Sequence, residues 1–400
     1  MALASDTRPL AAEVTAFLVR RARWSPLEIA FWLVALASIL FPTYIFPSKH
    51  LILTEICIWA MFALSLDLIL GYAGVISLGH AAFFGLGAYA AGLIGKHGLI
   101  PEPAVALVAS GLIAAAVGFA TSFLVLRGSD LTRLMVTFGV ALVLGEIANK
   151  LSDITGGADG LQGVEIKPIF GTFNFDIFGH TGYVYSVIVL FLMVALARRI
   201  VRSPFGLSLQ AIRGNVLRSS AVGIAVNWRL VAIYTLSAGY AGIAGAVLAQ
   251  TQAFASLEMF SIDRSADVLL ILIIGGTGYL YGGLIGAFIY RFAQDYLSAE
   301  LSARYWQFYI GFVLIMMVLF GRVYGGLLAA AIIAATVWFK IETGTSFLIT
   351  AACLFALAIA REPIVKWIGS TELRALAAIR QMRGQPPKVG SGRGAGHAGA

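Results

Sequence analysis

The residues with the clearest potential for chemistry lie between 71 and 89, in the stretch GYAGVISLGHAAFFGLGAY. This stretch places Ser77 and His80 among apolar residues and five glycines, and each glycine lowers helix propensity by about 1 kcal/mol relative to Ala. Lipid tolerates a loosened backbone only where protein or a water-filled path covers it. The pattern therefore predicts that this segment lies inside a helix bundle, close to the path of a solute. The alternative is a small-residue packing face between helices.

Seven residues from two glycine-rich stretches are predicted to line this path. Ser77 and His80 would supply its polar groups, and Phe84 or Tyr72 would supply an apolar wall. For His80 the alternative is a hydrogen bond between helices. Counterparts are expected in the second glycine-rich stretch, 237–250. The predicted set is Tyr72, Ser77, Gly79, His80, Phe84, Tyr240 and Gln250.

A second functional pattern lies in 204–226, PFGLSLQAIRGNVLRSSAVGIAV. Pro204 and Gly206 can begin a helix here and Gly223 can end it. An apolar stripe on or near one face of this segment indicates a docking site for a partner protein. The alternative is a helix on the membrane surface with its arginines at lipid phosphates. The stripe consists of Leu209, Ile212, Val216 and Leu217.

Composition identifies the elements that must position these residues. Hydrophobic residues make up 60% of the 400-residue chain and charged residues 12%, about half of the ~25% usual in a soluble domain. Apolar runs of roughly the ~20 residues that cross a bilayer recur along the chain, which predicts an all-α, polytopic membrane helix bundle. Spans are predicted at 27–46, 51–70, 74–95, 101–126, 131–150, 183–201, 229–250, 262–279, 281–297, 305–321, 325–340 and 345–361. The sequence GGTGYLYGG (275–283) should break a helix, so the span at 262–279 is expected to be short or discontinuous.

The basic residues set the predicted orientation of these spans. Arginines at 20, 21 and 23 place the N-terminus in the cytoplasm, and the region 198–229, which has six arginines and no acidic residue, is also placed inside. The loop 151–182 carries four acidic residues against Lys167 and is placed outside. Twelve crossings return the C-terminus to the cytoplasm. The net charge of +8 is thus interpreted as an orientation signal, not as a nucleic-acid surface.

No pattern in the chain predicts an enzyme. The sequence lacks the G-x-x-x-x-G-K-[ST] loop that binds ATP, and it lacks G-x-S-x-G and H-E-x-x-H. Cys57 and Cys353 lie far apart within apolar runs, which predicts neither a disulfide framework nor a metal site. We therefore expect no catalytic residues and no metal.

Residues 65–94 resemble the signature of the permease subunits of branched-chain amino acid ABC transporters, approximately S-L-N-L-x-x-G-Y-x-G-x-x-S-L-G-H-A-A-F-F-G-x-G-A-Y. Similar segments occur at 155–161, 206–215, 237–250 and 275–287, so the resemblance covers roughly 30 to 325. The chain departs from the pattern at Asp67 (usually Asn), Val75 (often Gln) and Val216 (usually Glu). The signature matches are Ser65, Leu66, Leu68, Gly71, Tyr72, Gly74, Ser77, Leu78, Gly79, His80, Ala81, Phe83, Gly85, Gly87, Ala88 and Tyr89.

The resemblance implies a permease subunit of an ATP-driven importer that moves branched-chain or related amino acids, or similar small solutes, across the bacterial inner membrane. The implied partners are cytoplasmic ATP-binding subunits that hydrolyse ATP, a second and paralogous permease subunit, and a periplasmic solute-binding protein. The chain itself would bind no cofactor and no nucleic acid, and would lie in the lipid bilayer with both termini cytoplasmic. The residues that would couple it to the ATPase are Gly206, Leu209, Ile212, Arg213, Asn215, Leu217 and Gly223.

The implied fold has about ten family-core transmembrane helices in two repeats, here with two extra C-terminal helices. The chain would begin with a cytoplasmic N-terminal segment (1–26) and continue as the permease transmembrane domain (27–325), which includes the coupling segment 204–226. An extra helix pair (326–361) and a basic, partly disordered cytoplasmic tail (362–400) would follow.

Two other functions remain open at this stage. An ion-coupled secondary transporter would need an ionisable residue facing the path, and Asp67 is the candidate, although a structural role that accepts hydrogen bonds from the backbone around Gly71 is favoured. An assembly or scaffold membrane protein would not need so many helices interrupted by glycine. Dependence of uptake on ATP, and co-purification with an ATPase, would separate the three functions.

Overall fold

The computed structural model describes residues 50–338 apart from 129, 170, 177–178, 301–305 and 321, together with residue 29. The chain divides into two compact units, Met1–Ala293 and Gln294–Ala400, and each is described by itself. The predicted N-terminal segment, the span at 27–46 apart from residue 29, the span at 345–361 and the basic tail lie outside the described residues.

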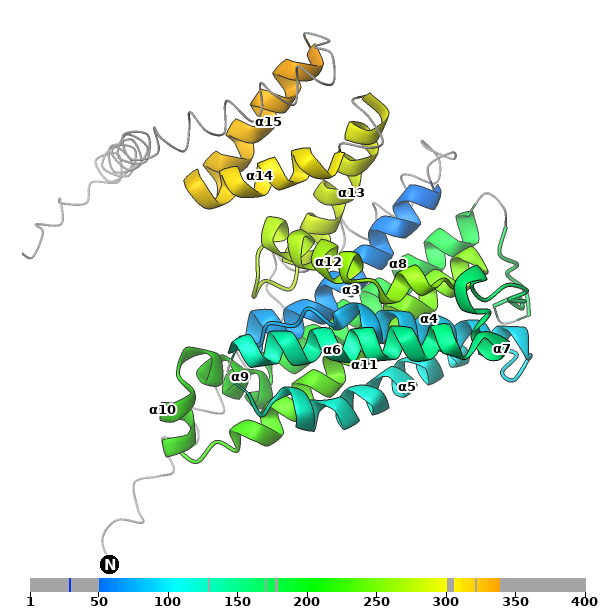
Figure 1. Ribbon diagram of the computed structural model, residues 1–400, viewed down its shortest axis with the longest axis horizontal. Coiled ribbons are helices and arrows are strands. Elements are labelled where there is room, and N and C mark those ends of the chain that lie inside the picture. The colour runs from blue at the N-terminus through cyan, green and yellow to red at the C-terminus, as the bar shows by residue number, and fades with distance from the viewer. Residues whose placement is uncertain are drawn as a thin grey trace, which may run out of the picture. The chain divides into compact units, whose positions relative to one another are not determined.

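The first unit is a bundle of helices (Figure 1). Within the described residues, five helices are long and apolar enough to cross a membrane, and the predicted polytopic helical bundle is confirmed. These five are α3 (His50–Ala73), α5 (Pro103–Val125), α6 (Asp130–Lys150), α8 (His180–Arg202) and α11 (Val226–Gln252). The other elements are α4 (His80–Lys96), α7 (Ser152–Thr155), η2 (Gly157–Asp159), α9 (Pro204–Gly214), α10 (Val216–Ala221), η3 (Leu257–Phe260), α12 (Ile262–Gly275) and α13 (Gly282–Glu300), whose last residues belong to the second unit.

Helix α11 forms the centre of the first unit, where it packs against α3, α4 and α5. Glycines on α11 bring the backbones together, because a Cβ at Gly242 would meet Ala114 on α5, and one at Gly245 would meet the carbonyl of Phe84 on α4. Without a strong hydrophobic force between helices in lipid, such small residues allow the close packing that holds membrane helices together. The glycine-rich stretch 237–250 therefore serves, at least in part, as a packing surface.

Two interruptions of helical structure matter for the functional site. Residues 74–79 are not helical, and Gly74 has a φ of 75°, so α4 begins at His80 and the predicted span of 74–95 is wrong at its start. Helix α12 has 14 residues and ends at a turn that contains Gly276 (φ 101°) and Gly278 (φ 81°). The helix before the glycine cluster is thus short, as predicted, and its crossing of the membrane stays a prediction.

The segment between α6 and α8 folds back on the bundle through α7 and η2. Its Leu161 pairs with Ala255 in an isolated β-bridge, and Asp176 accepts hydrogen bonds from the backbone N–H groups of Thr181 (2.9 Å) and His180 (3.4 Å). Slight burial of Asp176 acts to raise its pKa, but the backbone hydrogen bonds from Thr181 and His180 outweigh it, so the pKa lies below the usual value. A carboxylate at this position also stabilises the N-terminal end of α8.

The second unit contains α14 (Trp306–Phe320) and α15 (Arg322–Trp338), which pack against each other. Gly325 allows their close approach, because a Cβ there would meet the backbone of Met316. Both helices agree in position with the predicted spans 305–321 and 325–340, but with 15 and 17 residues they are not among the helices long enough to cross a membrane, so these two crossings stay predictions. The domain boundary at 325–326 stays a prediction.

Candidate functional site

The non-helical residues 74–79 link α3 to α4 and alternate between accessible and buried positions, with Gly74 and Ile76 exposed. Val75, Ser77 and Gly79 are buried, and side chains from neighbouring helices satisfy the backbone nearby. The N–H of Leu78 donates to Thr137 Oγ1 (3.2 Å), and that of Ala81 donates to Ser265 Oγ (3.0 Å). These side chains replace helical hydrogen bonds that the break removes.

Helix α4 consequently begins inside the bundle, level with the middle of α3. The ring of His80, its first residue, stacks beside Phe62 with ring centroids 6.3 Å apart, and Phe84 lies against the same Phe62 at 4.6 Å. A helix that starts at this depth presents its backbone donors to the interior instead of to solvent. Such discontinuous helices are a recurring feature of transporter binding sites.

His80 joins three helices through one hydrogen-bonded chain. Its Nε2 lies 2.9 Å from Ser237 Oγ on α11, and Ser237 Oγ donates to the carbonyl of Ser65 on α3 (2.6 Å). Because a hydroxyl carries one hydrogen, Ser237 accepts from Nε2–H, so Nδ1 is the unprotonated nitrogen of the ring when the imidazole is neutral. That Nδ1 and Ser77 Oγ are buried and have no hydrogen-bond partner within the part of the chain that the structure describes. His80 thus makes a hydrogen bond between helices, which is the alternative role predicted for it.

The structure brings only some of the predicted path residues together. Ser77, Gly79, His80 and Phe84 cluster around the start of α4. Tyr72 is buried near the end of α3, and Tyr240 donates to the carbonyl of Met193 on α8 (3.3 Å). Gln250 lies at the opposite end of α4, where its amide accepts from Tyr185 Oη (2.8 Å) and donates to the carbonyl of Pro103 (2.9 Å). Whether any of these residues lines the path stays a prediction.

Two glycines of the motif lie in tight packing contacts. A Cβ at Gly79 would clash with the backbone carbonyl of Thr137 on α6, and one at Gly85 would lie 2.8 Å from Cγ of Phe260 in η3. At both glycines an added Cβ would come so close to its neighbour that one of the two would have to move. Gly79 and Gly85 thus lie where small residues allow helices and loops to pack closely, as the packing alternative predicts.

The predicted coupling segment forms two short helices, so the single helix expected over 204–226 is wrong. Asn215 ends α9 and caps α10, because its Oδ1 accepts from the backbone N–H of Arg218 (2.9 Å). Leu209 and Ile212 are buried, as α9 packs on α3, α8 and α11. Only the α10 side of the stripe is available to a partner, where Val216 is 51% exposed and Leu217 is 81% exposed. Neighbouring Val222 is also exposed.

Helix α9 is connected to the end of α3 and to the turn after α12, at a site that we call the α9 junction (Asp67, Gly71, Arg213 and Gly278). The guanidinium of Arg213 donates to the carbonyl of Gly71, and the N–H of Gly278 donates to Asp67 Oδ1 (2.7 Å). Asp67 is 1% exposed. The aspartate that departs from the family pattern thus has a structural role as a hydrogen-bond acceptor, but its donor is Gly278 in the turn after α12 and not the backbone around Gly71 that was predicted.

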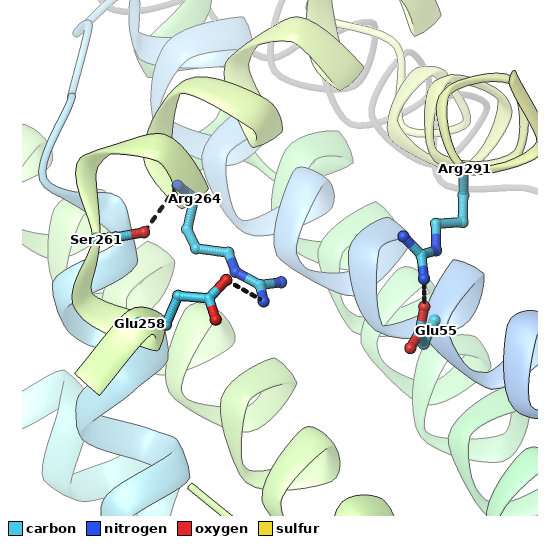
Figure 2. A network of polar contacts seen from close by, with 5 residues as sticks. All are labelled: Glu55, Glu258, Ser261, Arg264 and Arg291. Carbon is cyan, nitrogen blue, oxygen red and sulfur yellow. Dashed lines mark hydrogen bonds and ion pairs between the residues drawn. The ribbon is translucent and has the colours of Figure 1, made fainter. Parts of the chain in front are cut away.

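A cavity of about 230 Å³ lies beside the first half of α3, and we call it the charged pocket. Its wall includes Glu55, Trp59, Phe84, Glu258, Arg264 and Arg291. Figure 2 shows its two ion pairs: Arg264 binds Glu258 (3.1 Å), and Arg291 on α13 binds Glu55 on α3. The guanidinium of Arg264 also lies over the ring of Trp59, 5.3 Å from its centroid.

Sequence reasoning did not identify this pocket, although a signal was present. Glu55, Arg264 and Arg291 all fall inside predicted spans, and an ionisable residue in a membrane segment marks a functional site by default. The sequence-based prediction names only Asp67 as such a residue. The four charged residues come from separate elements, and their pairing requires the fold.

Comparison with known proteins identifies relatives among transport permeases. Residues 50–318 match the family described as "Branched-chain amino acid transport system / permease component". The high-affinity branched-chain amino acid transport system permease protein LivM of Escherichia coli is 28% identical over 260 residues, which cover 60% of this chain and 61% of LivM. LivM of Salmonella typhimurium is also 28% identical, over 59% of this chain and 60% of that protein. The chain thus spans about 60% of the length of these two curated relatives.

A second group of relatives carries a different substrate name. The ribose import permease protein RbsC of Escherichia coli is 26% identical over 301 residues, 71% of this chain and 88% of RbsC. No solved structure gives a significant match. The likeness is thus to membrane permeases whose names refer to amino acids in one group and to a sugar in the other.

Proposed function

The chain belongs to the branched-chain amino acid transport system permease family, and from this premise we propose that it is the membrane-spanning subunit of an ABC-type importer for branched-chain or related amino acids. The observation that carries the proposal is the family match over 50–318, a region that contains all five apolar helices. The similarity to LivM favours amino acids over the sugar named for RbsC, because LivM is matched with far stronger significance.

The proposed partners follow from the need for an energy source outside this chain. Cytoplasmic ATP-binding subunits would hydrolyse ATP, a paralogous permease subunit would complete the path, and a periplasmic binding protein would deliver the solute. The chain would lie in the bacterial inner membrane with both termini in the cytoplasm and with 151–182 on the periplasmic side. This chain would contribute the path and the docking surface.

The exposed apolar side chains of α10, with Leu217 the most exposed, are the proposed contact with an ATP-binding subunit. Any force on α10 would pass through Asn215 to α9, and from there through Arg213 to the end of α3. The α9 junction adds the turn after α12, because Gly278 binds Asp67 on the same helix. This sequence of contacts is a physical route from docking to the non-helical residues 74–79.

Uptake of labelled leucine by cells, with and without the chain, tests the proposal. We expect leucine uptake to require the chain and its co-encoded ATPase subunits, to stop when cellular ATP is depleted, and to persist when an ionophore collapses the ion gradients. Uptake that instead follows the ion gradient would support a secondary transporter. Leucine uptake that does not depend on the chain would contradict the proposal.

A further inference from the structure

We propose that the charged pocket is a binding site for a zwitterionic amino acid with an apolar side chain, so that the permease itself contacts and selects the solute. The inference rests on the proposed function and makes it more specific, since it assigns the substrate class to particular residues. It is argued from the size of the pocket, its charges and its apolar wall.

The pocket has room for a small solute. A cavity of roughly 10–15 Å³, measured in the same way, is enough for one water molecule, and this one measures about 230 Å³. The arginine side chains are only partly covered, with Arg264 27% exposed and Arg291 25% exposed. Water that occupies the cavity can therefore reach both guanidinium groups, and a ligand can displace it.

The charges of the pocket match those of a free amino acid. Two carboxylates and two guanidinium groups give it no net formal charge, which suits a ligand whose own charges cancel. A guanidinium has five N–H donors in a planar fork that fits a carboxylate, and the contact of Arg264 with Glu258 leaves donors for a second one. Glu55 and Glu258 supply acceptors for an ammonium group. The ligand would thus be held at both charged ends.

Part of the remaining wall is suited to an aliphatic side chain. Trp59 and Phe84 are joined there by Ile58, Leu248, Phe254 and Met259, from α3, α11, the segment before η3 and η3 itself, while Gln252 and Ser256 complete the lining with polar groups. Apolar surface is stabilised by removal from water, so a branched aliphatic group gains from contact with these side chains and a sugar hydroxyl does not. The combination of two arginines, two glutamates and this wall distinguishes an amino acid from ribose.

The pocket also borders the helix start described above. Phe84 belongs to the pocket wall and packs on Phe62, whose ring lies beside His80. Trp59 lies one helical turn from Glu55 and under the guanidinium of Arg264, so it should report on occupancy. A ligand in the pocket would thus be adjacent to the point where α4 begins.

The test is ligand binding to the purified full-length chain in lipid nanodiscs, without a binding protein, monitored by intrinsic fluorescence and by titration calorimetry. We expect L-leucine to bind. Leucinamide, which lacks the carboxylate, and 4-methylpentanoate, which lacks the ammonium group, should each bind at least tenfold more weakly. Equal binding of the three compounds, binding of D-ribose in place of leucine, or no leucine binding would each overturn the inference.

Variants locate the signal. The double variant Glu258→Gln/Arg264→Gln should weaken leucine binding at least tenfold, and Trp59→Phe should remove the fluorescence change that leucine causes. The matched control is Glu146→Gln/Lys150→Gln, which removes an exposed ion pair on α6 and should leave leucine affinity within twofold of the parent. Unchanged affinity in the pocket variant would overturn the assignment. If that variant does not fold, the comparison of leucine with its analogues still decides.

The binding experiment and the uptake experiment can contradict the two proposals independently. Leucine uptake that requires the chain, together with a purified chain that binds leucine no better than its two analogues, would leave the proposed function standing and remove the pocket. Leucine binding to the pocket without any effect of the chain on uptake would remove the proposed function.

Discussion

Helix α3 carries two carboxylates in opposite surroundings. Glu55 pairs with Arg291 in the wall of the charged pocket and its side chain is 31% exposed, whereas Asp67 is 1% exposed and accepts a hydrogen bond from the backbone N–H of Gly278. A side chain paired with another side chain in a cavity can exchange that partner for a ligand. A buried acceptor of a backbone hydrogen bond cannot leave without breaking the turn it holds. Two acidic residues of one helix can thus serve different purposes, Glu55 in ligand binding and Asp67 in holding the turn.

The largest loss of stability is expected from a change in the packing of α9 against the bundle. Ile212→Ala should destabilise the protein by about 2–5 kcal/mol, because it empties a buried position between α9 and the bundle. Leu217→Glu, on the exposed side of α10, should leave the folded yield unchanged and abolish association with the ATP-binding subunits. Unfolding in detergent and co-purification measure the two effects. Association that survives Leu217→Glu would contradict the proposed docking surface.

A smaller effect is expected at Asp67. Asp67→Ala leaves the N–H of Gly278 without its acceptor and should cost about 1–3 kcal/mol of stability. Asp67→Asn keeps an oxygen at the same position and should retain most of that stability and most of the uptake per folded molecule. An ion-coupled role for Asp67 predicts instead that Asp67→Asn folds normally and stops transport.

The smallest change in stability is expected at Glu55. Its ion pair with Arg291 is partly exposed, and such pairs contribute about 0–1 kcal/mol, so Glu55→Gln should fold like the parent. Leucine affinity should nevertheless fall about tenfold, because an acceptor for the ammonium group becomes neutral. A Glu55→Gln variant that unfolds but binds leucine normally when folded would reverse the comparison with Asp67.

Hydropathy predicted the helices well where the membrane alone dictates them. The spans at 101–126 and 131–150 correspond to α5 and α6 within two residues at each end, since covering an apolar thickness requires a helix of that length. The glycines at 71–87 correctly indicated a loosened backbone. They could not indicate that the break lies at 74–79, because this depends on side chains such as Thr137 and Ser265 that accept the freed N–H groups.

Two other features could not be predicted, and the reason is different. They are the burial of α9 against the bundle and the ion pairs of the charged pocket. Periodicity placed Leu209 and Ile212 on one stripe, but whether the bundle or a partner covers that stripe depends on where α3, α8 and α11 lie. In the pocket, the ion pair of Glu55 and Arg291 joins residues 236 positions apart. A single sequence contains the charges of such a pair but not their partners.

We propose that the permease selects an amino acid in the charged pocket, which is separate from the α9 junction. One uptake measurement tests this directly. The quantity is the initial rate of leucine uptake in the complete transporter carrying Glu258→Gln/Arg264→Gln, normalised to the amount of folded complex in the membrane. If the charged pocket binds the solute, the rate falls at least tenfold relative to the parent and to the control Glu146→Gln/Lys150→Gln. A rate per folded complex equal to that of the control would contradict it.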